Sequence, residues 1–459
     1  MRGKGAGELV LGDLFDAQAA RTPDVTAVRH GAVGLTFGEL ADRVDRLAER
    51  LVRRGTRPET PVALCVGRGV DMVTGLLAIV RAGGVLVPLD PRHPDERLRL
   101  LLRDCAAPLV LTRRDLAHRT SASGADPVFV DAGAPGGAEP VPSDAGTPVP
   151  RAGSPAAPGP AVPGPLPLNA ACLTYASGSS GVPEGVVVTH AGLTDLFHRH
   201  RARFIGPATR DAGGRRLRVA HTAALSSDAS WVPLLWLLAG HELHVVDHDT
   251  HEDAAAMLAY VGRHRIDVLD ETPSLLRPLV AAGLLDADRH RPSVITVGGG
   301  ALDDELRAAL AAAPGTRCHN RYGPAEATVD ALVRPVRPGG RPPAGRPSTG
   351  VRARVLDGAL RPVPAGTPGE LYLAGPGLAR GYHGRPGPTA ARFTADPHGP
   401  AGSRLYRTGD LVRVRADGET EFLGRVDDQA QIQGVRGEPR EAGAALLRHP
   451  GVTGAEELA

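Results

Sequence analysis

The sequence predicts an α/β protein, and three observations support that fold class. Short apolar segments of strand length alternate with segments of helical periodicity, which favours parallel strands joined by helices. Hydrophobic residues make up 42% of the 459 residues, enough to bury a sizeable core. Beyond about residue 340 the segments become short, β-forming and punctuated by glycine and proline, which indicates a β-rich subdomain over about 340–424.

The elements of the N-terminal part follow one another in a regular order. Helix 36–53 has the clearest boundaries, because Thr36 can cap it and Glu39 completes a capping box. The order of strand, helix and strand is typical of a parallel sheet. Helices are predicted at 9–18, 36–53, 71–82 and 93–104, and strands at 61–66, 84–89 and 108–112.

The regular pattern stops between Ser121 and Leu168. This segment is rich in proline, alanine and glycine and has no periodicity, so we expect a disordered insertion at about 121–168. Structure is expected to resume after it. Strands are predicted at 171–175, 186–189, 243–246, 268–269, 294–297, 354–356, 370–374, 412–415 and 420–423, and a helix at 253–260.

Charge and cysteine content exclude several classes of protein. The formal net charge is only +2, which argues against nucleic acid or an anionic membrane as the partner. The N-terminus lacks the apolar run of a signal peptide and no segment is long and apolar enough for a transmembrane helix, so we expect a cytoplasmic location. No CxxC spacing indicates a zinc site or a disulfide framework among Cys65, Cys105, Cys172 and Cys318.

An unusual loop lies between two predicted strands. It reads TYASGSSGVPEG over 174–185, and its glycines, serine hydroxyls and backbone N–H groups suit an anion. It is not a Walker loop, because GxxxxGK[ST] is absent. Its one charge, Glu184, has the wrong sign for a phosphate site. From these residues alone, a flexible turn is an equally good interpretation.

Six further segments lie before and after this loop: RAGGVLVPLDPRHP (81–94), SDASW (227–231), NRYGPAEAT (320–328), GELYLAGPGLARGY (369–382), YRTGD (406–410) and GRVDDQ (424–429). With these motifs the chain, from about residue 11 to about 453, resembles the amino-acid adenylation domains of nonribosomal peptide synthetases, which are adenylate-forming enzymes. The resemblance implies a large core at 1–424, with two αβ subdomains of layered sheets and helices and a small β-barrel-like subdomain. It also implies a hinge and a remnant of the C-terminal subdomain at 425–459, with that subdomain largely absent.

The resemblance implies a two-step reaction that uses ATP and Mg²⁺. The carboxylate of an α-amino acid attacks the α-phosphate to give an aminoacyl-adenylate and pyrophosphate, and the phosphopantetheine thiol of a carrier protein then takes the aminoacyl group. Other synthetase domains and a small helper protein are further partners that the resemblance allows. The alternatives are a catalytically degenerate nucleotide-binding or scaffold protein of the same fold and, more remotely, an enzyme similar to acyl-CoA ligases, which Asp228 opposes.

The resemblance also implies a nucleotide site. Asn320 would contact the adenine and Tyr322 would stack on it. Asp410 would accept both ribose hydroxyls, Glu326 would bind Mg²⁺, as a hard cation prefers an oxygen ligand, and Asp427 would be the hinge of the C-terminal subdomain. The full set of implied nucleotide-binding residues is Ser177, Gly178, Ser179, Ser180, Gly181, Gly299, Gly300, Asn320, Tyr322, Glu326, Asp410 and Arg425.

A second set of positions would form the amino-acid pocket. Asp228 would pair with the α-ammonium group, since a desolvated ammonium needs a charged partner. If Arg321 pairs with one of the two further acids, the other acid is free to hold a cation, so we expect a basic or strongly polar amino acid. The implied pocket residues are Asp228, Ala229, Val232, Asp270, Thr296, Gly298, Arg321, Val329 and Asp330.

Several positions depart from the family pattern. Two family threonines and two family lysines are replaced, at Ala176, Ala325, Glu184 and Gln431 respectively. Lys4 is the only lysine in the sequence, so no catalytic residue is assigned. The chain ends at Ala459, whereas the family's C-terminal subdomain continues. We therefore expect impaired adenylation by the isolated chain, whether it is a fragment, a split enzyme or a degenerate remnant.

Histidines outside these motifs are interpreted as structural. The segment DHDTHED (247–253) combines two histidines with four acids, but its spacing fits no metal-ligand pattern. We expect a solvated loop that leads into helix 253–260. His190 and His221 are interpreted as packed side chains, with an acid–base role for His221 as the alternative.

Overall fold

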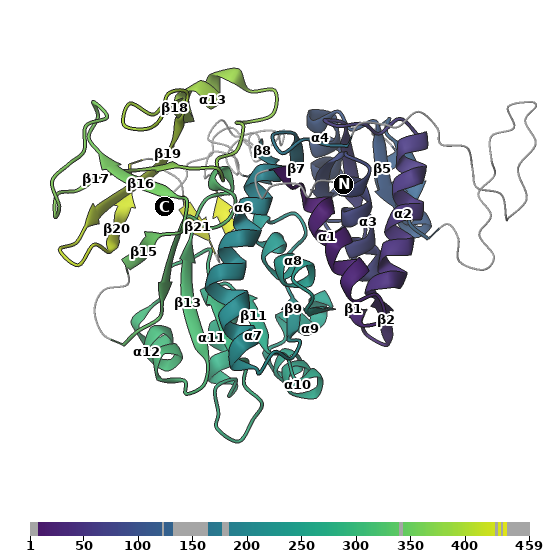
Figure 1. Cartoon of the computed structure of the whole chain (residues 1–459), viewed down its shortest axis with the longest axis horizontal. Helices are drawn as coiled ribbons and strands as arrows, with labels where there is room; N and C mark the ends of the chain where they lie inside the picture. The colour runs from purple at the N-terminus through teal and green to yellow at the C-terminus, as the bar shows by residue number, and fades with distance from the viewer. Residues whose placement is uncertain are drawn as a thin grey trace, which may run out of the picture.

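The computed structural model describes residues 8–121, 124–131, 164–176, 183–338, 343–426, 430–432 and 435–437. Within these residues two large sheets carry the fold, one of six strands and one of fourteen, and helices pack between and outside them (Figure 1). The predicted α/β class, with layered sheets and helices, is therefore confirmed. A separate hairpin pairs β21 (Ala430–Ile432) with β22 (Val435–Gly437).

The six-stranded sheet belongs to the N-terminal part of the chain. Its order is β6-β5-β3-β4-β7-β8, and its pairs are parallel except for β7–β8. The predicted alternation of strand and helix is confirmed here. The elements are α1 (Leu11–Arg21), α2 (Phe37–Arg53), β3 (Pro61–Cys65), α3 (Val70–Arg81), β4 (Val85–Leu89), α4 (Asp95–Cys105), β5 (Leu109–Thr112), η2 (Arg114–Leu116), α5 (Ala117–Thr120), β6 (Asp126–Phe129), β7 (Ala170–Ala176) and β8 (Glu184–Thr189).

The larger sheet has a parallel region in the order β1-β10-β9-β11-β12-β13, to which β2 adds an antiparallel edge. Its strands are β1 (Thr26–His30), β2 (Val33–Thr36), β9 (Arg218–His221), β10 (Glu242–Val245), β11 (Val268–Glu271), β12 (Val294–Val297) and β13 (Arg317–Tyr322). The accompanying helical elements are α6 (His190–His200), the π-helical η4 (Arg201–Ile205), α7 (Gly206–Asp211), η5 (Asp228–Ser230), α8 (Trp231–Leu238), α9 (His248–Glu252), α10 (Ala254–His264), α11 (Pro273–Ala281), α12 (Asp304–Ala312) and η6 (Ala325–Ala327).

The same sheet continues into an antiparallel region, which includes most of the segments predicted to be β-rich. It follows the order β13-β14-β15-β20-β19-β17-β16, and β18 pairs with β19. Figure 1 shows this region beside the parallel strands, on the side away from α2 and α3. Its elements are β14 (Leu332–Pro335), β15 (Pro343–Pro347), β16 (Arg352–Leu356), β17 (Gly369–Ala374), α13 (Pro386–Arg392), β18 (Phe393–Ala395), β19 (Arg404–Val414) and β20 (Thr420–Arg425).

Side-chain alternation along the strands builds the layers. On β3, Leu64 packs into the cluster that includes α1, α2, α3, α6 and α8, whereas Cys65 faces the outer helix α4. On β11, Val268 joins the same central cluster, and Leu269 faces α10, α11 and α12. The central helices are thus enclosed between the two sheets, and each sheet has a second helical layer outside it.

Two expectations about loops are wrong. Strand β6 lies inside the predicted insertion 121–168 and pairs in parallel with β5, so the insertion is shorter than the composition indicated; residues 132–163 lie outside the described part. Residues 248–252 form helix α9 rather than a solvated loop. None of the described helices combines the length and the apolar character that crossing a bilayer requires.

The capping box of α2 gives a first test of the fold. The Glu39 backbone N–H donates to Thr36 Oγ1 at 3.2 Å, and the Thr36 N–H donates to the Glu39 carboxylate at 2.8 Å. Thr36→Ala removes one partner of this pair and is expected to lower the free energy of unfolding by about 1 kcal/mol, measured by urea denaturation. Thr36→Ser keeps the hydroxyl and should retain most of the stability; equal losses in both variants would contradict the capping role.

Candidate functional site

The candidate site lies at the carboxyl ends of three neighbouring parallel strands. Asp270 of β11 is in register with Thr296 of β12, and β12 pairs in turn with β13, which carries Arg321. The alternation that turns Val268 and Val294 toward the central helices turns Asp270 and Thr296 the same way. Three predicted pocket residues, distant in the sequence, therefore meet on one face of the sheet.

Arg321 is the centre of this cluster. Its Nη1 donates to Asp330 Oδ1 at 2.5 Å, its Nη2 donates to Asp270 Oδ1, and all three side chains are buried. Thr296 Oγ1 donates to the same Asp270 oxygen at 2.5 Å. The guanidinium therefore pairs with both acids, and the expectation that one acid would be left without Arg321 is wrong.

Asp330 receives further support from helix α6. His200 Nε2 donates to Asp330 Oδ2 at 2.6 Å, and Arg199 Nη1 donates to the Asp330 backbone carbonyl at 2.5 Å. Burial alone would raise the pKa of Asp330, but Arg321 and His200 hold it well below its usual range. His200 was not predicted, because it lies 130 residues before its partner and belongs to no motif.

The turn that presents Asp330 is strained. Thr328 and Val329 have φ values of 54° and 67°, in the left-handed region that β-branched residues rarely adopt. A hydrogen bond from Thr328 Oγ1 to the Gly377 carbonyl (2.6 Å) holds the turn. A Cβ at Gly323 would lie 2.2 Å from the Val329 carbonyl oxygen, so only glycine permits this close return of the chain. The strain is thus enforced by the surrounding contacts.

Asp228 begins η5, directly before the buried helix α8 that contains Val232. Burial raises the pKa of Asp228 to about 6, against a hydrogen bond from the Ala229 backbone N–H, and the carboxylates of Asp330 and Glu326 raise it further. The carboxyl is still mainly ionised at pH 7. It lies in surroundings that favour a cationic partner, as the prediction for an α-ammonium contact requires.

The predicted nucleotide residues of β13 lie on the opposite face of the strand from Arg321, because Asn320 and Tyr322 flank it in sequence. The Tyr322 hydroxyl donates to Asp410 Oδ2, and Arg425 Nη1 donates to Asp410 Oδ1. Arg425 also donates to the Thr408 carbonyl at 3.1 Å. Three of the predicted nucleotide-binding side chains therefore form one cluster between β13, β19 and β20.

Two observations fit a bound nucleotide and its metal. Asn320 Oδ1 is buried and, among the described residues, has no hydrogen-bond partner, so it can accept from an amino group such as that of adenine. Glu326 is 1% exposed and accepts from the Tyr382 hydroxyl at 2.7 Å, which fixes its carboxylate. A fixed carboxylate oxygen suits Mg²⁺.

Two further predicted nucleotide-binding residues are glycines: Gly299 has a φ of 76°, and Gly300 borders Pro273.

The phosphate loop is only partly described. Ser177, Gly178, Ser179, Ser180, Gly181 and the hinge residue Asp427 lie outside the described residues. Glu184 begins β8 and is buried, with an interaction inside the protein, so it does not face solvent. The next residues of β8 bond to the motif around Tyr382, as the Val187 N–H donates to the Gly381 carbonyl at 2.9 Å. Repulsion of phosphate by Glu184 remains a prediction.

Three histidines outside the site, His190, His221 and His251, are buried. His251 of α9 bonds through Nε2 to the Glu271 carboxylate at 3.0 Å, and no cluster of metal-ligand type is found among the described residues. Burial lowers the pKa of His190 to about 4 and that of His221 to about 3, so both are neutral at pH 7. These features agree with the structural interpretation of both side chains.

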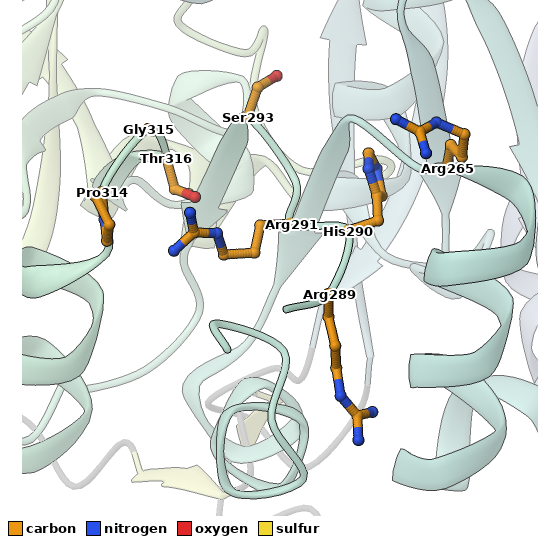
Figure 2. Close-up of a pocket in the computed structure, with 8 residues that line it drawn as sticks. All are labelled: Arg265, Arg289, His290, Arg291, Ser293, Pro314, Gly315 and Thr316. Atoms are coloured by element: carbon orange, nitrogen blue, oxygen red, sulfur yellow. The ribbon is translucent and has the colours of Figure 1, made fainter. Parts of the chain in front are cut away.

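A separate cavity of about 470 Å³ lies at the other ends of the same strands. Ser293 and Thr316, which directly precede β12 and β13, contribute to its wall. Figure 2 shows that Arg265, Arg289 and Arg291 point in different directions around it and do not converge on one point. This cavity is therefore distinct from the site at the carboxyl ends.

The chain matches the model of a known protein family over residues 15–383, a family described as "AMP-binding enzyme". This match covers most of the chain. The protein belongs to the AMP-binding enzyme family. Its assignment to this family of adenylate-forming ligases confirms the resemblance drawn from the motifs.

Relatives within the AMP-binding family are peptide synthetases. The chain is 36% identical to a dimodular nonribosomal peptide synthase of Bacillus subtilis over 464 residues, and 39% identical to phosphinothricin tripeptide synthetase PhsC of Streptomyces viridochromogenes over 444 residues. Each alignment covers 96% of this chain, but they cover only 18% and 38% of the two relatives. The chain thus spans a small part of these proteins, and the part that it matches is an adenylation module.

Solved structures give the same assignment. The nonribosomal peptide synthetase FmoA3 superposes with a TM-score of 0.77 at 29% identity, covering 92% of this chain and 43% of that one. NpsA-ThdA, an artificially fused adenylation–PCP di-domain from Klebsiella oxytoca, superposes with a TM-score of 0.81 at 22% identity, covering 97% and 85% of the two chains. The layered fold of AMP-binding enzymes of the peptide synthetase type is therefore present.

The buried charges predict a large loss of stability when Arg321 is removed. Arg321→Met leaves Asp270 and Asp330 without their shared cation and is expected to lower the free energy of unfolding by about 3–5 kcal/mol, measured by urea denaturation. The triple variant Arg321→Met/Asp270→Asn/Asp330→Asn removes all three charges and should recover much of that loss. Arg289→Met, at an exposed arginine, is the control and should change stability by less than about 0.5 kcal/mol. A mild effect of Arg321→Met would show that the guanidinium is not essential to the cluster.

Proposed function

We propose that this protein binds ATP–Mg²⁺ and an α-amino acid and joins them as an aminoacyl-adenylate, which is passed to the phosphopantetheine thiol of a carrier protein. The observation that carries the proposal is the arrangement around β13. Asn320 and Tyr322 lie on one face of the strand, where the Tyr322 hydroxyl donates to Asp410, whereas Arg321 lies on the other face with Asp270 and Asp330. Both substrates would therefore meet at the end of one strand.

Each of the predicted site residues would bind one group of the two substrates or the metal ion. Asp228 would hold the α-ammonium group and leave the carboxylate of the amino acid directed toward the nucleotide. Asn320 would bind the adenine, and Asp410, fixed by Tyr322 and Arg425, would accept from the ribose. Glu326 would hold Mg²⁺, which neutralises phosphate charge when bound. Positioning and charge neutralisation are what such a reaction needs from a protein.

Amino-acid-dependent exchange of pyrophosphate into ATP tests this function. We expect exchange above background with at least one proteinogenic or closely related α-amino acid, and thermal stabilisation of the protein by ATP–Mg²⁺. Stabilisation by ATP without exchange for any amino acid would favour the alternative of a nucleotide-binding or scaffold protein. If neither ATP nor any amino acid raises the melting temperature, the assignment of the binding site is wrong.

The pKa of Asp228 predicts how amino-acid binding depends on pH. Only the ionised carboxylate pairs with an ammonium group, and the free protein has a pKa of about 6 at this residue. Binding should therefore be at full strength above pH 7, and the KM for the amino acid should rise about tenfold for each pH unit below pH 6. Asp228→Asn should raise this KM strongly at all pH values and abolish its rise below pH 6. A KM for the unaltered protein that is constant between pH 7 and pH 5 would exclude Asp228 as the ammonium partner.

A further inference from the structure

The predicted amino-acid pocket contains two acids whose hydrogen bonds differ. Asp330 uses both carboxylate oxygens inside the protein, since Oδ1 accepts from Arg321 and Oδ2 from His200. Asp270 accepts from Thr296 and from Arg321, but both bonds fall on Oδ1. Among the described residues no side chain bonds to Asp270 Oδ2. Asp330 is therefore fully engaged, while Asp270 keeps one oxygen for another partner.

The cluster also carries an excess of negative charge. Two carboxylates, those of Asp270 and Asp330, face the single guanidinium of Arg321. Arg199, the other nearby cation, is paired with Asp195 at 2.8 Å. Burial lowers the pKa of His200, against the influence of Asp330, and so disfavours a positive charge on this side chain. Because a buried charge without a partner is unfavourable, this cluster would gain from a cation.

Asp270 is also the acid whose ionisation a nearby cation would favour. Burial raises its pKa above the usual value, against the influence of Arg321 and Thr296. Gly298 follows Thr296 by two residues, and a Cβ built at Gly298 would lie 3.4 Å from Arg321 Nη2. Gly298 therefore lies directly beside the charged cluster.

We propose that this pocket selects an α-amino acid whose side chain ends in a cationic nitrogen, which donates to Asp270 Oδ2. The proposal rests on the function proposed above and names its substrate class. We further infer that His200 is a positioning residue: it engages Asp330 Oδ2, so that Arg321 is held between the two acids and Asp270 is the acid left to bind the side chain. No other residue of α6 makes this contact with the Asp330 carboxylate among those described.

Pairs of amino acids that differ only in the terminal charge provide the test. Pyrophosphate exchange with the full chain would be compared for lysine against norleucine and for arginine against citrulline, with leucine and glutamate as further probes. We expect kcat/KM to be about 10- to 100-fold higher for the cationic member of at least one pair, as for a hydrogen bond to a charged group. A preference for leucine, norleucine, citrulline or glutamate would overturn the substrate class and leave the proposed function intact. Exchange with no amino acid at all would instead reject the proposed function and this inference with it.

Variants separate recognition from folding. Asp270→Asn should remove the preference for the cationic member of the pair and leave thermal stabilisation by ATP unchanged. The control is Asp288→Asn, at an exposed acid outside the site, which should change neither the preference nor the stabilisation. His200→Ala should reduce the ratio of kcat/KM between the cationic and neutral members about tenfold, and His200→Gln, whose amide can still donate to Asp330, should restore it. Loss of overall activity with an unchanged ratio would show that His200 is only structural. An unchanged ratio in Asp270→Asn would show that Asp270 does not contact the side chain.

Discussion

One buried interaction connects the elements on which the pocket depends. Arg321 of β13 joins Asp270 of β11 to Asp330, which follows the strained turn at 328–329. His200 then ties Asp330 to helix α6. Charged groups at this depth are tolerated only when each has its partner, so the positions of strand, turn and helix are mutually determined. A substitution at any of these residues would therefore disturb the positions of all three elements.

The second cluster, formed by Tyr322, Asp410 and Arg425, connects the sheet in a different direction. It joins the last parallel strand to two strands of the antiparallel region, at the place where the sheet changes from one type to the other. The predicted nucleotide site therefore lies where the parallel and antiparallel regions of the sheet join. Its side chains are fixed by each other, and Asn320 Oδ1 remains buried without a partner among the described residues.

Much of this architecture could be predicted from local signals. The capping box at Thr36 and the apolar segments of strand length identified α2, β3, β4 and β5 to within a few residues. Strand β6 was missed because its short sequence lies next to a proline-rich segment. Its strand conformation is evident only from its pairing with β5, which is a tertiary contact. The double pairing of Arg321 could not be foreseen, since its partners lie 51 and 9 residues away and their geometry depends on tertiary structure. His200 carries no sequence signal at all.

The alternation of side chains along β13 has a consequence for how such a protein can change. Residue 321 lies on the face of the predicted amino-acid pocket, while residues 320 and 322 lie on the face of the predicted nucleotide site. Replacement of Arg321 together with its acids would therefore alter which side chain fits, without moving the groups that face the nucleotide. On the proposed function, one strand would separate the choice of amino acid from the chemistry on the nucleotide, and a new specificity would need substitutions on one face alone.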